Sequence, residues 1–377
     1  MADPTAKIRV LIVDDSTVVR RFLTNAIAAD PAFEVVGTAS NGALGLQKIA
    51  LLAPHVVTMD IEMPEMSGLQ ALAAIRRTNP TLPVIMVSSL TERGAVATLE
   101  ALSLGATDYV TKPSAVSALG DAEKDSFVRD LLPKLKALGR RGTPLGAARA
   151  PGTAATPARP RVAPLSPAAP RRMSRVDVIA IGISTGGPNA LAELIPALPA
   201  DLPVPIVIVQ HMPPLFTRLL AERLAGKSAL RIKEGNGGDS LTPGTVIIAP
   251  GNFHMTVERV PGGACQIALN QGVLENSCRP AADVLFRSVS EAYGAGVLAI
   301  VMTGMGQDGL HGCEAVRGRG GQVLVQDEES SIVWGMPGFV ADAGLADEVL
   351  ALNQIAPAIV RSVRVGREAA RSAGGRG

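Results

Sequence analysis

Short apolar runs rich in β-branched residues alternate with segments of helical character along most of this 377-residue chain. Strands of a parallel sheet have this composition, because the helices that connect them bury both faces of the sheet. A predicted helix follows each of the first five runs. These runs are Ile8–Asp15, Glu34–Thr38, Val56–Asp60, Val84–Ser88 and Tyr109–Lys112. The alternation predicts a doubly wound α/β domain over residues 6–138.

The alternation stops at residue 139 and returns at residue 176. Residues 139–175 hold eight arginines and no Asp, Glu or Lys, and are otherwise rich in Gly, Ala and Pro. Such a composition cannot bury enough apolar surface to offset the entropy of ordering. We therefore predict a flexible, disordered linker there and a second disordered segment at 367–377. Residues 176–366 are predicted to form a Rossmann-like three-layer α/β/α domain with a mostly parallel sheet.

Composition argues against several classes of protein. The net charge is +2, but arginines concentrate in the linker and near the C-terminus, so the predicted domains are acidic and do not suit nucleic acid. No apolar run reaches the roughly 18–20 residues that cross a bilayer, so membrane insertion is not expected. Cys265, Cys278 and Cys313 form no CxxC pair, which indicates free thiols in a reducing compartment. We expect a cytoplasmic protein that acts as a monomer.

Polar side chains gather at the strand ends of the first domain. Because the carboxyl ends of parallel strands meet at one sheet edge, these side chains should lie close together. They are Asp14, Asp15, Asp60, Ser88 and Lys112. Clustered carboxylates repel one another unless a cation joins them, and Mg²⁺ accepts carboxylate and phosphate oxygens. A carboxylate beside Mg²⁺ and a lysine can attack a phosphoryl group and form an aspartyl phosphate, although each acid alone would also suit a solvated loop.

Three motifs of this domain resemble the response-regulator receiver family. They are Val13-Asp14-Asp15-Ser16, Met59-Asp60-Ile61-Glu62-Met63-Pro64 and Val110-Thr111-Lys112-Pro113. The resemblance implies a flavodoxin-like (βα)5 fold in which Asp60 accepts phosphate from a histidine kinase. The implied Mg²⁺ ligands are Asp14, Asp15, Asp60 and the backbone carbonyl of Glu62. The residues implied to respond to phosphorylation are Lys112 and Ser88, which would contact the phosphate, and Tyr109, which would change position.

The second domain opens with a strand, a glycine-rich turn and a helix. The segment reads Val178-Ile179-Ala180-Ile181-Gly182-Ile183-Ser184-Thr185-Gly186-Gly187-Pro188. Ser184 lies at the apex of the turn, where a side chain leaves the sheet and the amides of the next helix point towards it. We therefore predict Ser184 as a nucleophile. The amides of Thr185, Gly186 and Gly187 are candidate donors to an oxyanion.

A serine nucleophile needs a base, and the base needs a carboxylate that fixes its tautomer. His211 directly follows the apolar strand Pro205–Gln210. Asp308 lies in a glycine-rich loop after the strand Val297–Met302. Both side chains should emerge at the sheet edge that carries Ser184, so these three residues form the predicted triad.

The histidines and Asp308 also allow other assignments. His254 and His311 are rival bases, although His254 follows its strand by several residues and His311 lies on the helix beyond Asp308. Taken alone, His211 could be satisfied by backbone groups. Asp308 could cap the helix that begins near Leu310, in addition to any catalytic role.

The pattern Gly182-x-Ser184-x-Gly186 also fits the nucleophile elbow of α/β-hydrolases. Those enzymes order their triads Ser, Asp or Glu, and His, whereas the order here is Ser, His, Asp. A glycine-rich turn could instead hold a nucleotide phosphate, but neither GxxxxGK[ST] nor GxGxxG is present. The alternative function is a response regulator whose second domain binds a nucleotide or a partner protein without esterase activity.

Four motifs of the second domain resemble the chemotaxis protein-glutamate methylesterases, the CheB family. They are Ile179-Ala180-Ile181-Gly182-Ile183-Ser184-Thr185-Gly186-Gly187-Pro188, Gln210-His211-Met212-Pro213-Pro214, Ile248-Ala249-Pro250-Gly251 and Thr303-Gly304-Met305-Gly306-Gln307-Asp308-Gly309. The resemblance implies that Ser184, His211 and Asp308 hydrolyse γ-glutamyl methyl esters on methyl-accepting chemotaxis receptors, releasing methanol without a cofactor. It implies an oxyanion donor at the Met305 amide, deamidation of glutamine in some members, and inhibition by the unphosphorylated receiver domain.

Two residues depart from the family pattern. Ile183 stands where a small alanine is usual, which could reshape the turn that holds Ser184. Cys278, in Asn276-Ser277-Cys278-Arg279-Pro280, stands where a histidine is common. Neither departure is expected to contact the triad, so both bear on substrate detail rather than on the reaction.

Overall fold

The protein is described by a computed structural model over residues 7–112, 121–140 and 175–374. The chain divides into two compact units. The linker predicted at 139–175 falls almost entirely outside the described residues, as do Gly375–Gly377. Within the described ranges, no helix is long and apolar enough to cross a membrane.

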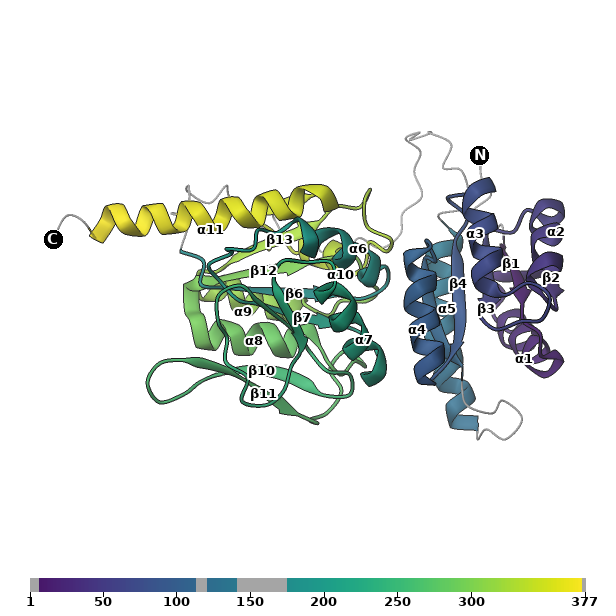
Figure 1. Cartoon of the computed structure of the whole chain (residues 1–377), viewed down its shortest axis with the longest axis horizontal. Coiled ribbons are helices and arrows are strands. Elements are labelled where there is room, and N and C mark those ends of the chain that lie inside the picture. The colour runs from purple at the N-terminus through teal and green to yellow at the C-terminus, as the bar shows by residue number, and fades with distance from the viewer. Residues whose placement is uncertain (1–6, 113–120, 141–174, 375–377) are drawn as a thin grey trace, which may run out of the picture. The chain divides into compact units, whose positions relative to one another are not determined.

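The first domain is a five-stranded parallel sheet flanked by helices (Figure 1). Its strand order is β2-β1-β3-β4-β5, so the connections run to opposite sides from β1. This confirms the predicted doubly wound (βα)5 fold. Such a reversal of strand order opens a crevice at the carboxyl ends of β1 and β3, the place where α/β domains bind ligands.

The strands of this domain are short and largely buried. Their bounds are Ile8–Val13 (β1), Phe33–Ala39 (β2), Val56–Asp60 (β3), Val84–Ser89 (β4) and Asp108–Lys112 (β5). The helices are Thr17–Ala28 (α1), Gly42–Leu52 (α2), Gly68–Thr78 (α3), Glu92–Ser103 (α4) and Asp121–Gly139 (α5). Side chains cap the amino ends of several helices. Ser16, for example, accepts a hydrogen bond from the Val19 amide at the start of α1.

The loop between β3 and α3 folds back onto the end of its own strand. The Gly68 amide donates to the Ile61 carbonyl at 2.9 Å. A Cβ atom at Gly68 would lie 1.9 Å from the carbonyl oxygen of Asp60, a backbone atom that cannot move aside. Glycine is therefore the residue that lets this loop pass over Asp60.

We predict that Gly68→Ala destabilises the first domain by at least about 1–3 kcal/mol, the usual cost of overpacking, and lowers its Tm. Gly45→Ala in α2 is the control, because its added Cβ would meet Val13 at 3.2 Å and alanine favours helix. Thermal unfolding followed by circular dichroism compares the two variants. A Tm for Gly68→Ala equal to wild type would contradict the clash.

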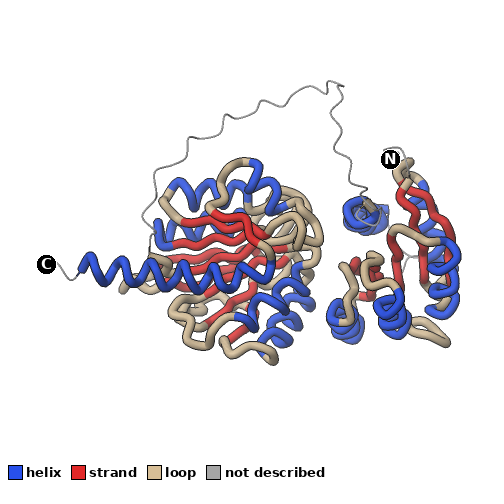
Figure 2. Tube along the Cα trace, turned by 90° about the horizontal axis from the view of Figure 1, so that it is seen from above, coloured by secondary structure: helices blue, strands red, loops and turns tan. Residues whose placement is uncertain are grey.

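The second domain is built on a seven-stranded parallel sheet with the order β14-β13-β12-β6-β7-β9-β8. Figure 2 shows strands of this sheet in red, with helices in blue on either side. A separate antiparallel hairpin, β10-β11, packs beside it. Helices cover the sheet in a three-layer arrangement, as predicted. The strands are Val178–Ile183 (β6), Ile206–Gln210 (β7), Arg231–Glu234 (β8), Thr245–Ile248 (β9), His254–Arg259 (β10), Cys265–Asn270 (β11), Val297–Val301 (β12), Gln322–Gln326 (β13) and Glu348–Leu350 (β14). The helices are Gly187–Leu194 (α6), Pro214–Ala225 (α7), Ala282–Tyr293 (α8), Leu310–Gly318 (α9), Met336–Asp342 (α10) and Leu352–Gly374 (α11).

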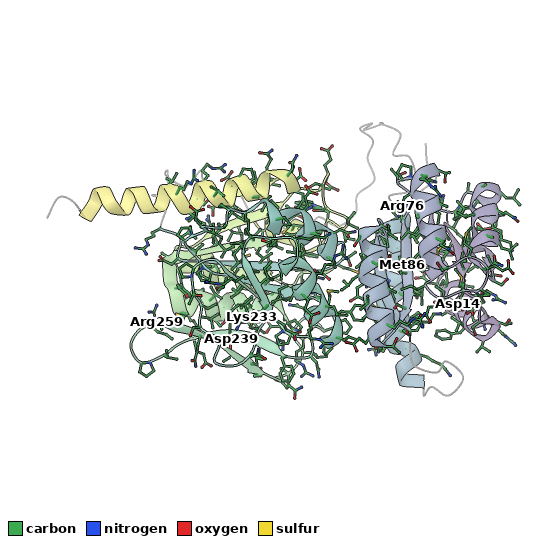
Figure 3. All side chains as sticks on the ribbon, viewed as in Figure 1. Asp14, Arg76, Met86, Lys233, Asp239 and Arg259 are labelled. Atoms are coloured by element: carbon green, nitrogen blue, oxygen red, sulfur yellow. The ribbon has the colours of Figure 1, made fainter. Side chains whose placement is uncertain are left out.

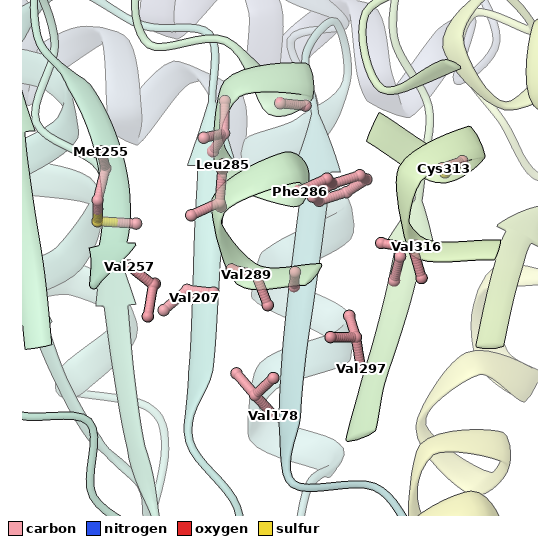
Figure 4. Close-up of a cluster of buried hydrophobic side chains, with 14 of the residues drawn as sticks. Val178, Val207, Met255, Val257, Leu285, Phe286, Val289, Val297, Cys313 and Val316 are labelled. Atoms are coloured by element: carbon pink, nitrogen blue, oxygen red, sulfur yellow. The ribbon is translucent and has the colours of Figure 1, made fainter. Parts of the chain in front are cut away.

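A core of apolar side chains joins α8 to the sheet and to β10 (Figure 4). Phe286, at its centre, is fully buried. Small residues let α8 approach closely, since a Cβ at Gly182 would lie 2.7 Å from the Cβ of Ala282. A Cβ at Gly312 would likewise lie 2.5 Å from the Cβ of Phe286. This close packing fixes the amino end of α8 against β6 and α9.

The C-terminal region differs from the prediction. The disordered segment predicted at 367–377 overlaps the end of α11, which continues to Gly374. The predicted disordered tail is therefore wrong as far as Gly374. Ile355, Ile359 and Val363 are buried and anchor the first turns. A helix nucleated by packing extends at little cost through the Arg- and Ala-rich sequence that follows, because both residues favour helix.

Candidate functional site

The carboxyl ends of three adjacent strands carry the predicted triad. In the sheet, β6 lies between β12 and β7. Ser184 directly follows β6, His211 directly follows β7, and Asp308 lies in the loop between β12 and α9. The parallel register therefore brings all three residues to one edge of the sheet, as the strand pattern predicted.

A tight turn holds Ser184 between β6 and α6. Its amide donates to the Thr303 carbonyl at 3.0 Å, and its carbonyl accepts from the Gly187 amide at 2.8 Å. Gly186 has φ +78°, a conformation that favours glycine. A Cβ at Gly304 would lie 2.9 Å from the Cβ of Ser184. The loop after β12 therefore runs directly against the serine.

Ile183 fits this turn without disturbing its pairing. The side chain is fully buried. Its position in β6 still pairs with Gln210 of β7, and its carbonyl accepts the His211 amide at 3.2 Å. The larger residue is therefore accommodated in the core next to Ser184.

His211 and Asp308 form a direct hydrogen bond, with Nε2 of the imidazole 2.8 Å from Oδ2 of the carboxylate. Because an ionised carboxylate only accepts, the proton of this bond belongs to Nε2. Burial lowers the pKa of His211, but hydrogen bonds to Asp308 and Cys278 outweigh it and raise that pKa to about 10. The neutral imidazole would carry its lone pair on Nδ1, which is thus the basic atom.

Asp308 is buried and accepts hydrogen bonds on both carboxylate oxygens. Oδ2 also accepts the Ala282 amide at 2.6 Å, and Oδ1 accepts the Asp283 amide at 3.0 Å and the Gly309 amide at 3.1 Å. Burial would raise the pKa of Asp308, but the bond with His211 and the backbone amides hold it below its usual value. The two amides at the start of α8 show that Asp308 stabilises that helix. The suggested cap of α9 is wrong, because the capping residue is Gly309.

The loop at residues 275–279 contacts the triad, which corrects the expectation that Cys278 would not. Sγ of Cys278 lies 3.6 Å from Nδ1 of His211. Nδ2 of Asn276 donates to Oδ1 of Asp308 at 3.0 Å and to Oδ2 of Asp283 at 2.9 Å. Asn276 and Cys278 lie about 30 positions before Asp308 in the chain, so no sequence motif could predict that they contact the triad.

The candidate oxyanion donors differ in whether their amides already donate a hydrogen bond within the protein. The Gly187 amide is bonded to the Ser184 carbonyl, so Gly187 is excluded. Thr185 is buried next to the nucleophile, and its carbonyl accepts from the Thr303 hydroxyl at 2.9 Å. Met305 follows Gly304, which packs against Ser184. The amides of Thr185, Gly186 and Met305 therefore stay the candidate donors.

The rival histidines have partners elsewhere. Nε2 of His254 donates to the Val273 carbonyl at 2.9 Å. His311 is exposed and pairs with Glu314 at 2.9 Å. Neither histidine contacts Ser184 or Asp308, so among the described residues His211 alone has the geometry of a base.

The first domain gathers its polar residues at the ends of β1, β3 and β5. One oxygen from each of Asp14, Asp15 and Asp60 lies within 4.8 Å of the others (Asp14 is labelled in Figure 3). Nζ of Lys112 lies 2.7 Å from Asp14 and 2.7 Å from Asp60. Burial raises the pKa of Asp60 to about 6, against the opposing effect of Lys112.

Ser88 and Tyr109 lie on the neighbouring strands. Ser88 is buried at the end of β4. Tyr109, on β5, is also buried, and Nζ of Lys134 lies 5.5 Å from the centre of its ring. Lys134 further donates to the Tyr109 carbonyl at 2.8 Å and pairs with the buried Asp108. The Glu62 carbonyl belongs to the loop that Gly68 closes over Asp60.

Sequence reasoning missed several residues that shape the second site. Gln210 is buried, and its Nε2 donates to the Ser184 carbonyl at 3.0 Å. The Thr303 hydroxyl links the Thr185 carbonyl to the Val333 amide. Both are polar residues at the ends of apolar strands, a signal that could have found them. Asn276 and Cys278, in an irregular loop, carried no such signal.

Comparison with known proteins identifies the family of each domain. Residues 179–359 match the family model described as CheB methylesterase, and residues 10–123 match that of the response regulator receiver domain. A protein-glutamate methylesterase/protein-glutamine glutaminase of Trichodesmium erythraeum is 47% identical over 365 residues, covering 95% of this chain and 99% of the relative. Its namesake in Nocardioides sp. is 49% identical over 359 residues, with 94% and 95% covered.

Among solved structures, the crystal structure of the Thermotoga maritima CheB methylesterase catalytic domain matches with 41% sequence identity and a TM-score of 0.48. The match covers 49% of this chain and 98% of that domain's chain. The family matches and the two full-length relatives confirm the resemblance of both domains. The chain belongs to the CheB methylesterase family and carries an N-terminal response regulator receiver domain.

Proposed function

We propose that this protein hydrolyses γ-glutamyl methyl esters on chemotaxis receptors, under the control of phosphorylation at Asp60. The observation that carries the proposal is the His211–Asp308 hydrogen bond at the strand end next to Ser184. The relatives named above as protein-glutamate methylesterases support the substrate class. Their names include protein-glutamine glutaminase, so we extend the proposal to deamidation of receptor glutamines at the same site.

In this mechanism, Nδ1 of neutral His211 removes the proton of Ser184 as Oγ attacks the ester carbonyl. Asp308 stabilises the imidazolium that forms. The C–O bond to the methoxy group then breaks, and the imidazolium protonates the leaving group, which departs as methanol. Water, deprotonated by His211, cleaves the acyl–Ser184 bond and restores the hydroxyl. With an amide, the leaving group is ammonia and the steps are otherwise the same.

The oxyanion of each tetrahedral intermediate needs preorganised donors, and loss of one donor costs about 10²–10³ in rate. We assign this role to the amides of Thr185 and Met305. Gly304 packs against Ser184, and the Thr303 hydroxyl binds the Thr185 carbonyl, so both amides belong to loops tied to the nucleophile. This arrangement supports hydrolysis without a cofactor.

Receiver domains bind Mg²⁺ for phosphorylation, and the acidic cluster fits that ion. Asp14, Asp15 and Asp60 offer clustered carboxylate oxygens, the ligands that Mg²⁺ prefers. We propose these residues and the Glu62 carbonyl as its ligands. The ion would neutralise charge on the incoming phosphoryl group, while Lys112 and Ser88 contact the phosphate and Tyr109 responds to it. Asp60 is the proposed phosphoacceptor from a histidine kinase.

We predict that a small-molecule phosphodonor with Mg²⁺ raises methanol release from methylated receptor fragments by about tenfold, if the competent state rises from about a tenth of the population. Asp60→Asn, which cannot form the aspartyl phosphate, should stay at the basal rate. Radiolabelled methanol is measured for both proteins with and without the donor. Equal activity in all four conditions would contradict control by the receiver domain. Absence of methanol in every condition would contradict the esterase itself.

A further inference from the structure

His211 has two ring nitrogens, and three side chains could bond to them: those of Asp308, Cys278 and Ser184. Asp308 holds Nε2 at 2.8 Å, which leaves Nδ1 as the only basic atom. Sγ of Cys278 lies 3.6 Å from that atom. Within the part of the chain that the structure describes, no hydrogen bond joins Oγ of Ser184 to His211. The thiol therefore occupies the atom that the nucleophile needs.

The loop that carries Cys278 is held from several sides. Cys278 and Glu275 exchange two backbone hydrogen bonds, at 3.1 and 2.8 Å. Glu275 pairs with Arg287 of α8 at 2.5 Å. Arg279 donates to the Gly272 carbonyl at 2.8 Å and to the Asn252 side chain at 2.7 Å. Asn276 also bonds to Asp308. These hydrogen bonds and the ion pair fix the conformation of the loop, and the loop conformation places the thiol against His211.

We propose that Cys278 is a positioning residue for the hydrolysis reaction: its sulfur holds Nδ1 of His211, and Ser184 gains its base only when that contact opens. The proposal rests on the proposed function of the triad. Cys278 has no direct part in bond making. It sets the orientation and the availability of the imidazole, and so the pH range in which the nucleophile can be activated.

The charges around His211 give the direction of this effect. The hydrogen bonds with Asp308 and Cys278 both raise the pKa of His211, against burial. The other charged groups of this region are Asp283 and Arg287 on α8, and Glu275 and Arg279 on the loop itself. Removing the sulfur lowers the pKa of His211, so more of the imidazole is neutral at a given pH.

The first test is the pH dependence of kcat/KM for methanol release by the full chain. Cys278→Ala is expected to move the half-maximal pH down by about one unit, so that activity at neutral pH rises up to about tenfold. Cys278→Ser should shift it less, because the hydroxyl can still meet Nδ1. Val273→Ser is the control, since Val273 is 91% exposed in the same loop. A half-maximal pH that is unchanged or higher in Cys278→Ala, with Tm preserved, would overturn the proposal.

The second test does not depend on ester hydrolysis. Cys278 is half-buried, whereas Cys265 and Cys313 are buried. Iodoacetamide should therefore alkylate Cys278 first: the S–C bond forms, iodide leaves with the electron pair of the C–I bond, and the thiol proton passes to the buffer. Mass spectrometry follows the rate.

His211→Gln is expected to slow the alkylation of Cys278 about tenfold, because a nearby imidazole favours the reactive thiolate. An unchanged rate would refute the thiol–imidazole contact. If the alkylation depends on His211 but no methanol is released, the proposed function fails while the contact stands. If methanol is released but the alkylation rate does not depend on His211, the proposed function stands and the thiol–imidazole contact is refuted.

Discussion

Ser184→Ala will lower methanol release from methylated receptor fragments by about 10⁴-fold or more, because alanine has no atom that can form the acyl intermediate. A small residual rate is expected from the oxyanion donors and from substrate binding. The domain should stay folded, since the amide and carbonyl of residue 184 keep their hydrogen bonds to Thr303 and Gly187.

Ser240→Ala is the matched control, because Ser240 is an exposed serine on the same domain. It should hydrolyse ester at the wild-type rate. Receptor binding, measured separately by calorimetry, should be retained in both variants. Ser184→Ala with wild-type methanol release would refute the triad. Binding without turnover even in the wild type would favour the alternative of a response regulator that only binds a partner.

The second large effect is expected from Asp308→Asn. The amide can present N–H to Nε2 of His211 and so favour the wrong tautomer, which lowers kcat/KM by about 10³–10⁴-fold. Stability should also fall, by about 3–5 kcal/mol, the usual result of removing one member of a buried pair. Asp177→Asn, at the amino end of the same sheet, is the control and should change neither quantity much.

The pH dependence of stability checks the same pair. The pKa of Asp308 is held below its usual value, so its contribution is present above the unfolded-state pKa of about 4 and is lost as the pH falls through the folded-state pKa. The pKa of His211 is raised to about 10, so its contribution is complete below about pH 6.5 and is lost as the pH rises towards 10. The wild-type domain should thus be most stable at mildly acidic pH.

The rate of hydrolysis should rise with pH, whereas stability falls, because hydrolysis needs the neutral form of His211. Thermal unfolding and methanol release across the same pH series separate the two curves. In Asp308→Asn the stability maximum should flatten. A wild-type domain whose stability and activity rise together with pH would contradict this assignment of charges.

Strand positions were the most predictable part of the protein. The runs that became β3 and β6 are apolar, rich in β-branched residues and end at Asp60 and just before Ser184. Burial on both faces of a parallel sheet requires such runs, so local sequence already determines them. Short edge strands such as β8, with alternating charged residues, were missed because they bury only part of one face.

The C-terminal helix was underestimated for a different reason. Composition after Arg361 lacks the apolar periodicity that signals a packed helix, yet α11 reaches Gly374. Its buried first turns supply the nucleus, and continuation then needs only helix-favouring residues. Nucleation by tertiary packing is not visible in a local sequence window.

The sequence by itself determined that Ser184, His211 and Asp308 would share one sheet edge, because parallel strands bring their carboxyl ends together whatever lies between them in the chain. Only the tertiary structure decided which atoms meet. The close approach of α8 at Gly182 delivers two amides to Asp308, and the loop before α8 delivers Asn276 and Cys278. These contacts join residues tens of positions apart through irregular backbone, whose path depends on packing rather than on any periodic pattern.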